Sequence, residues 1–270
     1  MYRYAVIGDP VSHSKSPLIH SLFAQQTGED ISYAATGVDA LNFDDFVIKF
    51  FAEGGSGLNV TLPHKERAYK IAKCLEPRAE QAGAANTLFI SGEGEICGDN
   101  TDGPGLINDI KCNNGIDIAG VDVLLVGAGG AIRGVLVSLI EEKPATITIV
   151  NRTIAKASIL KAKFNEVIDI KTVSYENLRG SFDLIINGTS LGITREIPPL
   201  SAENINNHTC CYDMMYGNTE TAFVAWAKDK GARKVFDGLG MLVEQAAESF
   251  LRWRGVRPRT SEVISKLRNL

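Results

Sequence analysis

Strand-like segments alternate with helix-like segments along the whole chain, and this alternation limits the folds that the chain can adopt. Residues 4–8 (YAVIG) form a short apolar run typical of a buried strand, and residues 16–28 carry apolar side chains at helical spacing up to a terminating glycine. Strand then helix follows twice more, over residues 31–55 and 57–75, before two strands joined at a glycine-containing turn in residues 85–103. Because strands that alternate with helices pair mainly in parallel, the sequence predicts an α/β fold with a mainly parallel sheet.

A second set of alternating segments begins near residue 120. Residues 121–142 (VDVLLVGAGGAIRGVLVSLIEE) pass from a strand through a glycine-rich turn into a helix, and residues 145–164 repeat strand then helix. Further strands are expected at residues 182–190, 209–216 and 232–238. The final helices, residues 241–256 and 260–270, follow this set and carry large apolar side chains that need a core. We therefore expect two domains, with the end of the chain returning to the first.

Composition excludes several classes of protein. The 270 residues are 44% hydrophobic and 22% charged, which is typical of a soluble globular chain, and a net charge of −4 argues against nucleic acid as a partner. No apolar run approaches the roughly 18 residues that span a bilayer, and the first residues do not resemble a signal peptide. The odd set of Cys74, Cys97, Cys112, Cys210 and Cys211 contains no CxxC pair and no zinc spacing. We expect a cytoplasmic protein with reduced thiols, no metal and no membrane contact.

The turn in VLLVGAGGAIRG (residues 123–134) is typical of a dinucleotide site because it joins a strand to a helix. Gly127 allows the tight turn, and Gly129 lets the backbone approach a pyrophosphate at the helix N-terminus. The third position of the usual pattern, normally glycine or alanine, is Ile132. A plain turn between a strand and a helix is the alternative interpretation.

The end of the next strand indicates which dinucleotide binds. An NAD site is expected to have an acidic residue there for the ribose 2′-hydroxyl, but this strand ends in Asn151-Arg152-Thr153. The Arg152 guanidinium suits a 2′-phosphate, Thr153 offers a hydroxyl and Lys156 adds positive charge. The sequence therefore predicts NADP, the alternative being surface residues that open a helix.

Four polar clusters lie at the ends of strands in the first half, at residues 13–16, 59–61, 84–87 and 99–103. Their serine, threonine and asparagine side chains are neutral hydrogen-bonding groups, which suit a polyhydroxylated ligand. Taken singly, each has another explanation, since Ser16 and Asp102 are good helix caps and Asn86 is a good turn residue.

Lys65 is unusual because we expect Pro63 to be the first residue of a helix, which places Lys65 in the first turn. Cations are usually better placed at the other end of a helix. Lys65 is either an ordinary solvated lysine or a general base whose pKa the helix dipole and desolvation lower and a nearby carboxylate raises.

In order along the chain, nine segments resemble the shikimate dehydrogenases, and the resemblance covers essentially the whole chain. They are GDPVSHSKSPLIH, GLNVTLPHKE, AANT, GDNTDG, VGAGGA, NRT, INGTSLG, YDMMY and DGLGMLVEQAAESFLRW. The resemblance implies reversible NADPH-linked reduction of 3-dehydroshikimate to shikimate, a step toward chorismate and the aromatic amino acids. It also implies a discontinuous substrate domain (residues 1–101 and 239–270) and a Rossmann-like NADP-binding domain (residues 102–238).

Site residues follow from the same resemblance. Lys65 and Asp102 are expected to be the catalytic pair that transfers the proton and titrates as a coupled unit. The residues expected to hold the substrate are Ser14, Ser16, Asn59, Thr61, Asn86, Tyr216 and Gln245. Those expected at the cofactor are Gly127, Ala128, Gly129, Gly130, Ala131, Asn151, Arg152, Thr153, Lys156, Thr189, Met214 and Gly238. His13 and His64 lie beside these segments, but neither has an obvious carboxylate partner in its motif.

Three alternatives stay open on the sequence alone. The first is a quinate/shikimate dehydrogenase of broader range, often using NAD, against which the missing acid after residue 150 counts. The second is a non-catalytic NADP-binding sensor, which would be expected to lack Lys65 or Asp102. The third, an enzyme that reduces folate derivatives, calls for a flatter and more apolar pocket. The sequence leaves open whether the protein is a monomer or a homodimer.

Overall fold

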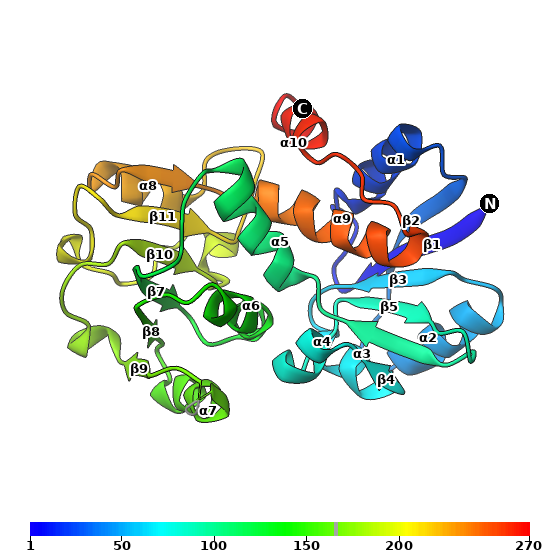
Figure 1. The fold of residues 1–270 in the computed structure, drawn as a ribbon, viewed down its shortest axis with the longest axis horizontal. Helices are drawn as coiled ribbons and strands as arrows, with labels where there is room; N and C mark the ends of the chain where they lie inside the picture. Colours follow the sequence, from blue (N-terminus) through cyan, green and yellow to red (C-terminus); the bar gives the residue numbers. More distant parts are fainter. Residues whose placement is uncertain (165–166) are drawn as a thin grey trace. The chain divides into compact units, whose positions relative to one another are not determined.

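The chain forms two compact units in a computed structural model that describes residues 1–164 and 167–270. Unit 1 comprises Met1–Leu106 together with Leu242–Leu270, and unit 2 comprises Ile107–Met241. The chain passes from one unit to the other within helix α5 (Asp102–Asn108) and returns within helix α9 (Leu239–Arg254). Both helices are labelled in Figure 1.

Unit 1 contains a six-stranded sheet in the order β2-β1-β3-β5-β6-β4. The strands are β1 (Tyr2–Gly8), β2 (Ile31–Gly37), β3 (Gly57–Val60), β4 (Cys74–Leu75), β5 (Thr87–Ile90) and β6 (Ile96–Asp99). β5 pairs antiparallel with β6, as the predicted hairpin requires, and it also pairs antiparallel with β3. The remaining pairs are parallel, so the prediction of a mainly parallel sheet is confirmed.

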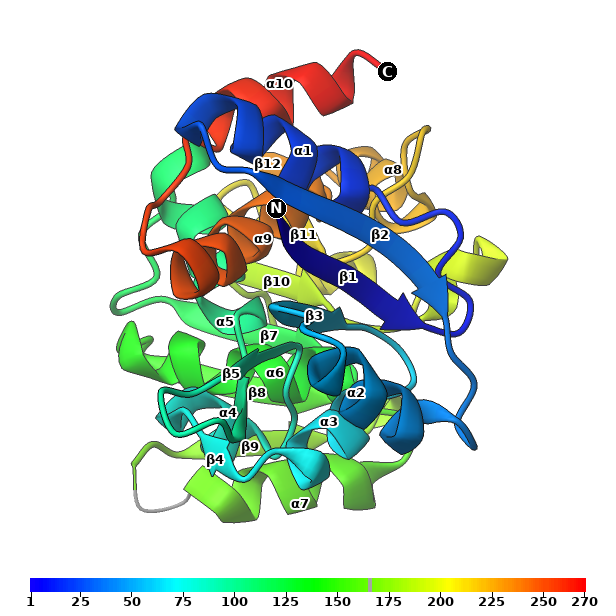
Figure 2. The same cartoon turned by 90° about the vertical axis from the view of Figure 1, so that its right-hand side faces the viewer.

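Helices from both ends of the sequence pack in unit 1. They are α1 (Ser16–Thr27), α2 (Phe43–Ala52), α3 (Lys65–Ile71), α4 (Pro77–Ala82), most of α9, and α10 (Ser261–Arg268). Figure 2 shows α10 beside α1, and Gln26 of α1 exchanges two hydrogen bonds with the Arg259 backbone just before α10. α9 spans 16 residues, and no helix within the described ranges is long and apolar enough to cross a membrane.

An aromatic cluster in unit 1 joins the first strands to the end of α9. The Trp253 ring stacks on Tyr4 of β1 with 4.6 Å between ring centroids. The His20 ring stacks on Tyr33 of β2 at 4.1 Å and lies 5.5 Å from Trp253. Phe250 of α9 packs against His20 and Phe23 and is completely buried, whereas Trp253 is partly buried by its contacts.

Unit 2 contains a second six-stranded sheet, in which each pairing is parallel. The strands run in the order β12-β11-β10-β7-β8-β9, with bounds β7 (Asp122–Val126), β8 (Thr146–Val150), β9 (Ile170–Val173), β10 (Leu184–Asn187), β11 (Cys210–Asp213) and β12 (Lys234–Phe236). The first strand lies in the middle, and the chain winds outward in one direction and then in the other. This order is that of a Rossmann fold, which confirms the predicted fold class.

Helices of several lengths complete the described part of unit 2. The α-helices are α6 (Gly130–Glu141), α7 (Ile154–Phe164) and α8 (Ala222–Asp229), which Figure 1 labels. A π-helical segment (Asp109–Asn113) continues α5. Short 3₁₀ segments lie at Tyr175–Asn177, Leu191–Thr194 and Ala202–Asn204.

The prediction of a single helix over residues 63–75 is wrong. Pro63 lies in a turn that the His64 N–H closes onto the Thr61 carbonyl at 3.0 Å, and the Leu62–Pro63 peptide is cis. α3 therefore begins at Lys65, which still occupies the first turn. The end of the expected helix instead forms β4, because pairing with β6 satisfies its backbone groups.

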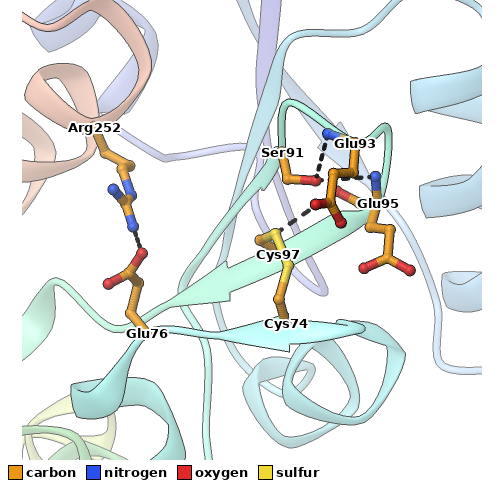
Figure 3. Close-up of a disulfide and its surroundings, with 7 residues drawn as sticks. All are labelled: Cys74, Glu76, Ser91, Glu93, Glu95, Cys97 and Arg252. Carbon is orange, nitrogen blue, oxygen red and sulfur yellow. Dashed lines mark hydrogen bonds and ion pairs between the residues drawn. A yellow bond between two sulfur atoms is a disulfide. The ribbon is translucent and has the colours of Figure 1, made fainter.

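The expectation that each cysteine is reduced is also wrong. Cys74 and Cys97 face each other across the β4–β6 pair and are joined by a disulfide, with 4.6 Å between their Cα atoms (Figure 3). That separation is within the range that a disulfide bridges. The sequence contained no sign of the disulfide, because the bond depends on strand register rather than on local spacing.

An ion pair between Arg252 of α9 and Glu76, the residue directly after β4, connects α9 to the same region of unit 1 (Figure 3).

Candidate active site

Lys65 and Asp102 form an ion pair in unit 1. Lys65 is the first residue of α3 and Asp102 the first of α5, and the Lys65 Nζ donates to Asp102 Oδ2 at 2.6 Å. The Lys65 side chain is 20% exposed and that of Asp102 is 8% exposed. Charge-assisted hydrogen bonds of this length are strong, and the Lys65 side chain keeps part of its surface exposed.

Asn86 holds the other oxygen of the same carboxylate. Its Nδ2 donates to Asp102 Oδ1 at 2.8 Å and to Thr101 Oγ1 at 3.0 Å. Its Oδ1 accepts from the Thr101 N–H at 2.8 Å. Gln245 Oε1 lies 3.3 Å from the same Nδ2 and brings α9 to the cluster. The Asp102 carboxylate is therefore oriented through both of its oxygens.

Asn59 lies at a second centre of hydrogen bonding and is 6% exposed. Its Oδ1 accepts from the Tyr33 hydroxyl at 2.7 Å, and its Nδ2 donates to Ser249 Oγ at 2.9 Å. Burial raises the pKa of the Tyr33 phenol, and a hydrogen bond with the Ser16 side chain partly opposes that effect. Tyr33 thus links Asn59 to Ser16.

The remaining predicted substrate residues lie in both units. Ser14 Oγ accepts from the Ser16 N–H at 3.2 Å at the start of α1. Ser16 is the first residue of that helix, whose N-cap position is Lys15, and no side chain caps its N-terminus. Thr61 follows β3, and its N–H donates to the Ile7 carbonyl at 2.9 Å. Tyr216 belongs to unit 2, where burial raises the pKa of its phenol.

The glycine-rich turn of unit 2 leaves open space at its centre. Gly127 has φ 105°, a conformation that favours glycine, and its N–H donates to the Val150 carbonyl at 2.8 Å. A Cβ atom placed on Gly129 or on Gly130 would meet nothing within 4 Å. α6 begins at Gly130, and the N-terminus of a helix favours an anion such as a pyrophosphate.

Ile132 departs from the usual pattern, and the structure supplies the reason. Its side chain is completely buried, and a Cβ on Gly188 would lie 2.5 Å from Ile132 Cδ1. Close packing between the helix and the sheet is therefore achieved by a glycine after β10 rather than by one on α6. The departure does not disturb the turn.

The segment after β8 carries positive charge on an exposed surface. Asn151 Nδ2 donates to the Thr153 carbonyl at 2.7 Å, which shapes the turn into α7. Arg152, Thr153 and Lys156 are exposed, and no acidic residue lies among residues 151–156. A guanidinium in such a turn suits a phosphate group.

Three further predicted cofactor residues follow the carboxyl ends of neighbouring strands. The Thr189 Oγ1 donates to Asn187 Oδ1 at 2.8 Å, and the Met214 N–H donates to the Asn187 carbonyl at 2.9 Å. Gly238 follows β12, and its N–H donates to the Met215 carbonyl at 3.0 Å. Ligands of open α/β sheets bind at this edge, outside the carboxyl ends of the strands.

Comparison with known proteins shows the family. The family model for the shikimate dehydrogenase substrate binding domain matches residues 6–88, that for shikimate/quinate 5-dehydrogenase matches residues 111–195, and that for the shikimate 5′-dehydrogenase C-terminal domain matches residues 238–268. A curated relative from Hahella chejuensis, shikimate dehydrogenase (NADP(+)), is 52% identical over 268 residues, which cover 99% of each chain. The chain belongs to the shikimate dehydrogenase family. The resemblance expected from the nine motifs is therefore confirmed.

Solved structures are similar over almost the whole chain. An Ael1 enzyme from Pseudomonas putida has a TM-score of 0.94 at 43% identity, covering 99% of this chain and 98% of that one. Shikimate 5-dehydrogenase from Thermus thermophilus, solved in complex with NADP(H) and shikimate, has a TM-score of 0.90 at 33% identity, covering 100% of this chain and 99% of that one.

Within this member of the shikimate dehydrogenase family, sequence reasoning missed several residues of the hydrogen-bonding clusters. They are Tyr33, Thr87, Ser249, Asn187 and Asp213. Ser249 lies four residues after Gln245 and so on the same face of α9, which was a usable signal. Asp213 stands within the YDMMY motif, where it is completely buried and accepts from Asn187 Nδ2 at 3.0 Å.

The two histidines beside the motifs have structural surroundings. His64 is buried, its Nε2 lies 2.6 Å from the Val38 carbonyl oxygen, and its ring packs 4.8 Å from that of Phe43. The His13 Nδ1 lies 3.1 Å from Ser12 Oγ in an exposed loop. The contacts of both rings are therefore with groups other than the Lys65–Asp102 pair.

Proposed function

We propose that this chain is an NADP-dependent shikimate dehydrogenase, which interconverts 3-dehydroshikimate and shikimate on the route to chorismate and the aromatic amino acids. The observation that carries the proposal is the Lys65–Asp102 pair, with 2.6 Å between Nζ and Oδ2. Around it are neutral amides and hydroxyls rather than an apolar pocket, as a polyhydroxylated substrate requires. The full-length relatives named shikimate dehydrogenase (NADP(+)) support the same activity.

Lys65 and Asp102 carry the proton transfer in this proposal. Lys65 in its neutral amine form takes the proton of the substrate hydroxyl during oxidation, and the ammonium so formed returns it during reduction. An ammonium has three donors, and Asp102 occupies one of them, which fixes the direction of Nζ. Because Asn86 holds the second oxygen of Asp102, the carboxylate cannot turn away from Lys65 without breaking both bonds.

NADP is the cofactor that the residues of unit 2 fit. The open space at Gly129 and Gly130 admits a pyrophosphate, and Arg152 with Lys156 suits a 2′-phosphate. The residues that would hold it are Gly127, Ala128, Gly129, Gly130, Ala131, Asn151, Arg152, Thr153, Lys156, Thr189, Met214 and Gly238. When bound, NADP⁺ supplies the acceptor for the hydride that leaves the carbon bearing the hydroxyl.

The substrate would be held mainly by unit 1. We assign this role to Ser14, Ser16, Asn59, Thr61, Asn86 and Gln245, together with Tyr216 of unit 2. We also propose residues 1–101 and 239–270 as the substrate domain and residues 102–238 as the cofactor domain, although the two compact units divide after Leu106 and before Leu242, so that Asp102 belongs to unit 1. We further propose that the protein acts in the cytoplasm as a monomer or a homodimer, without nucleic acid as a partner.

The test is NADPH absorbance with purified protein, NADP⁺ and shikimate, run in parallel with NAD⁺ and with quinate. Rapid reduction of NADP⁺ with shikimate alone is the expected result. Cofactor reduction that is faster with quinate than with shikimate, or with NAD⁺ than with NADP⁺, would indicate the broader quinate/shikimate dehydrogenase class. NADP⁺ binding without any reduction would refute an enzymatic role and favour a sensor.

A further inference from the structure

Ser249 connects the two hydrogen-bonding clusters of unit 1, one around Asn59 and the other around Asn86. It lies on α9, is completely buried, and its Oγ contacts three side chains from other segments. The distances are 2.9 Å to Asn59 Nδ2, 2.8 Å to Thr87 Oγ1 and 3.2 Å to Thr101 Oγ1. The same Oγ lies 3.1 Å from the Gln245 carbonyl, one turn earlier on the helix.

One branch from Ser249 sets the orientation of Asn59. The Tyr33 hydroxyl donates to Oδ1 at 2.7 Å, while Nδ2 faces three acceptors. These acceptors are Ser249 Oγ at 2.9 Å, Thr87 Oγ1 at 3.2 Å and the Asn86 carbonyl at 3.3 Å. The contact with Ser249 is the shortest of the three. An amide nitrogen has two hydrogens, so the Nδ2 donors are taken up inside the protein.

The other branch leads to the proposed catalytic pair. Thr101 Oγ1 lies 3.2 Å from Ser249 Oγ and accepts from Asn86 Nδ2 at 3.0 Å. Asn86 in turn donates to Asp102 Oδ1, whose partner oxygen binds Lys65. Buried networks of this kind respond to the loss of one member as a unit, because the members polarise and orient one another.

We propose that Ser249 is a positioning residue for the dehydrogenase reaction. Its hydroxyl keeps the Asn59 amide and the Thr101 hydroxyl in the orientation from which Asn59 and Asn86 meet the substrate. Removal of the Oγ leaves a buried amide donor without its shortest acceptor, so Asn59 turns toward other partners. This inference rests on the proposed function, since it concerns how the same site holds shikimate.

Four variants of the full chain test the inference. Ser249→Ala removes the oxygen alone, while Ser249→Thr and Ser249→Val have the same shape and differ in the hydroxyl. Ser138→Ala on α6 removes another buried serine hydroxyl, in unit 2, and serves as the matched control. Each is measured for KM of shikimate, KM of NADP⁺, kcat, and NADP⁺ affinity by fluorescence titration.

We expect the KM of shikimate to rise about tenfold in Ser249→Ala and Ser249→Val, because a buried donor loses its partner. Ser249→Thr should retain a KM within about threefold of wild type, and NADP⁺ affinity should stay within about twofold in each variant. Ser138→Ala should leave the KM of shikimate unchanged. This pattern separates positioning of the substrate groups from a general loss of structure, which would move both substrates together.

Three results would overturn the inference. The first is a KM of shikimate in Ser249→Ala equal to that of Ser138→Ala. The second is an equal loss of shikimate and NADP⁺ affinity in Ser249→Ala, which would mark a purely structural role. The third is a wild type that binds NADP⁺ but does not oxidise shikimate, since the proposed function would then fail as well. If Ser249→Thr does not fold, the comparison of Ser249→Ala with Ser138→Ala decides alone.

Discussion

Lys65 and Asp102 meet at 2.6 Å although 37 residues separate them in the sequence. Each stands at the first residue of a helix, so the meeting depends on how α3 and α5 start rather than on any local motif. Asn86, which lies between them in the sequence, binds Asp102 as well. Three segments thus converge on one carboxylate.

Lys65→Ala should lower kcat about 10²- to 10⁴-fold, because general acid–base catalysis contributes that much and alanine cannot transfer the proton. NADP⁺ affinity, measured by fluorescence titration, should not change. Lys70→Ala on the same helix removes an exposed lysine and is the control, with kcat expected near wild type. Near-native turnover of Lys65→Ala would refute the assignment.

Arg152→Ala should raise the KM of NADP⁺ about 10- to 100-fold, since hydrogen bonds to charged groups are worth more than neutral ones. The KM of NAD⁺, which lacks the 2′-phosphate, should change little. Steady-state kinetics with both cofactors measure the difference. Lys163→Ala, which removes a positive charge near the end of α7, is the control. An equal effect on NADP⁺ and NAD⁺ would show that Arg152 does not distinguish them.

Much of the fold followed from local pattern, because strands and helices of ordinary length carry their own periodicity. The hairpin of β5 and β6 and the helix that Gly28 ends are examples. β4, of two residues, has no periodicity of its own and exists through its pairing with β6. The same limit applies to Ser249, whose side-chain partners come from segments that only the folded chain brings together. A local sequence pattern does not contain information about which distant segments pair or pack together.

Ile132 and Gly188 offer a test of that long-range packing. Gly188→Ala places a Cβ 2.5 Å from Ile132 Cδ1 and should destabilise unit 2 by about 1–3 kcal/mol, as overpacking does. Ile132→Ala alone should cost about 2–5 kcal/mol through the cavity that it leaves. In the double variant, the methyl group added at position 188 should occupy part of that cavity, so the combined loss should be smaller than the sum. Urea unfolding of the three variants measures this, and strict additivity would contradict the contact.

The free energy of unfolding should depend on pH through His20. Its ring is completely buried, and burial lowers its pKa from 6.5 to about 3, an effect that the nearby Asn59 side chain partly offsets. Neither ring nitrogen has a hydrogen-bond partner of normal geometry among the described residues. The unfolded chain binds a proton near its ordinary pKa, and the folded chain only near 3, so stability is lost as the pH falls between these values.

Between pH 7.5 and 5.0 this linkage predicts a loss of about 2 kcal/mol in unfolding free energy. His20→Phe, which keeps an aromatic ring against Tyr33, should reduce that loss, whereas His208→Gln at an exposed position should not. Urea unfolding at the two pH values gives the comparison. An unchanged pH dependence in His20→Phe would place the acid sensitivity elsewhere.

Cys74 and Cys97 should be distinguishable from the other three cysteines by thiol titration. Oxidised protein should show thiols of Cys112, Cys210 and Cys211 alone after denaturation, and five thiols after reduction. In the native state the exposed Cys112 should react first, since burial raises the pKa of Cys211 to about 12 and disfavours its thiolate.

Cys97→Ser should lower the free energy of unfolding of oxidised protein by about 3 kcal/mol, the loop-closure value for a loop of this length. Under reducing conditions, as in the cytoplasm, the variant and the wild type should differ far less. Five thiols in oxidised wild type would show that the bond does not form in solution.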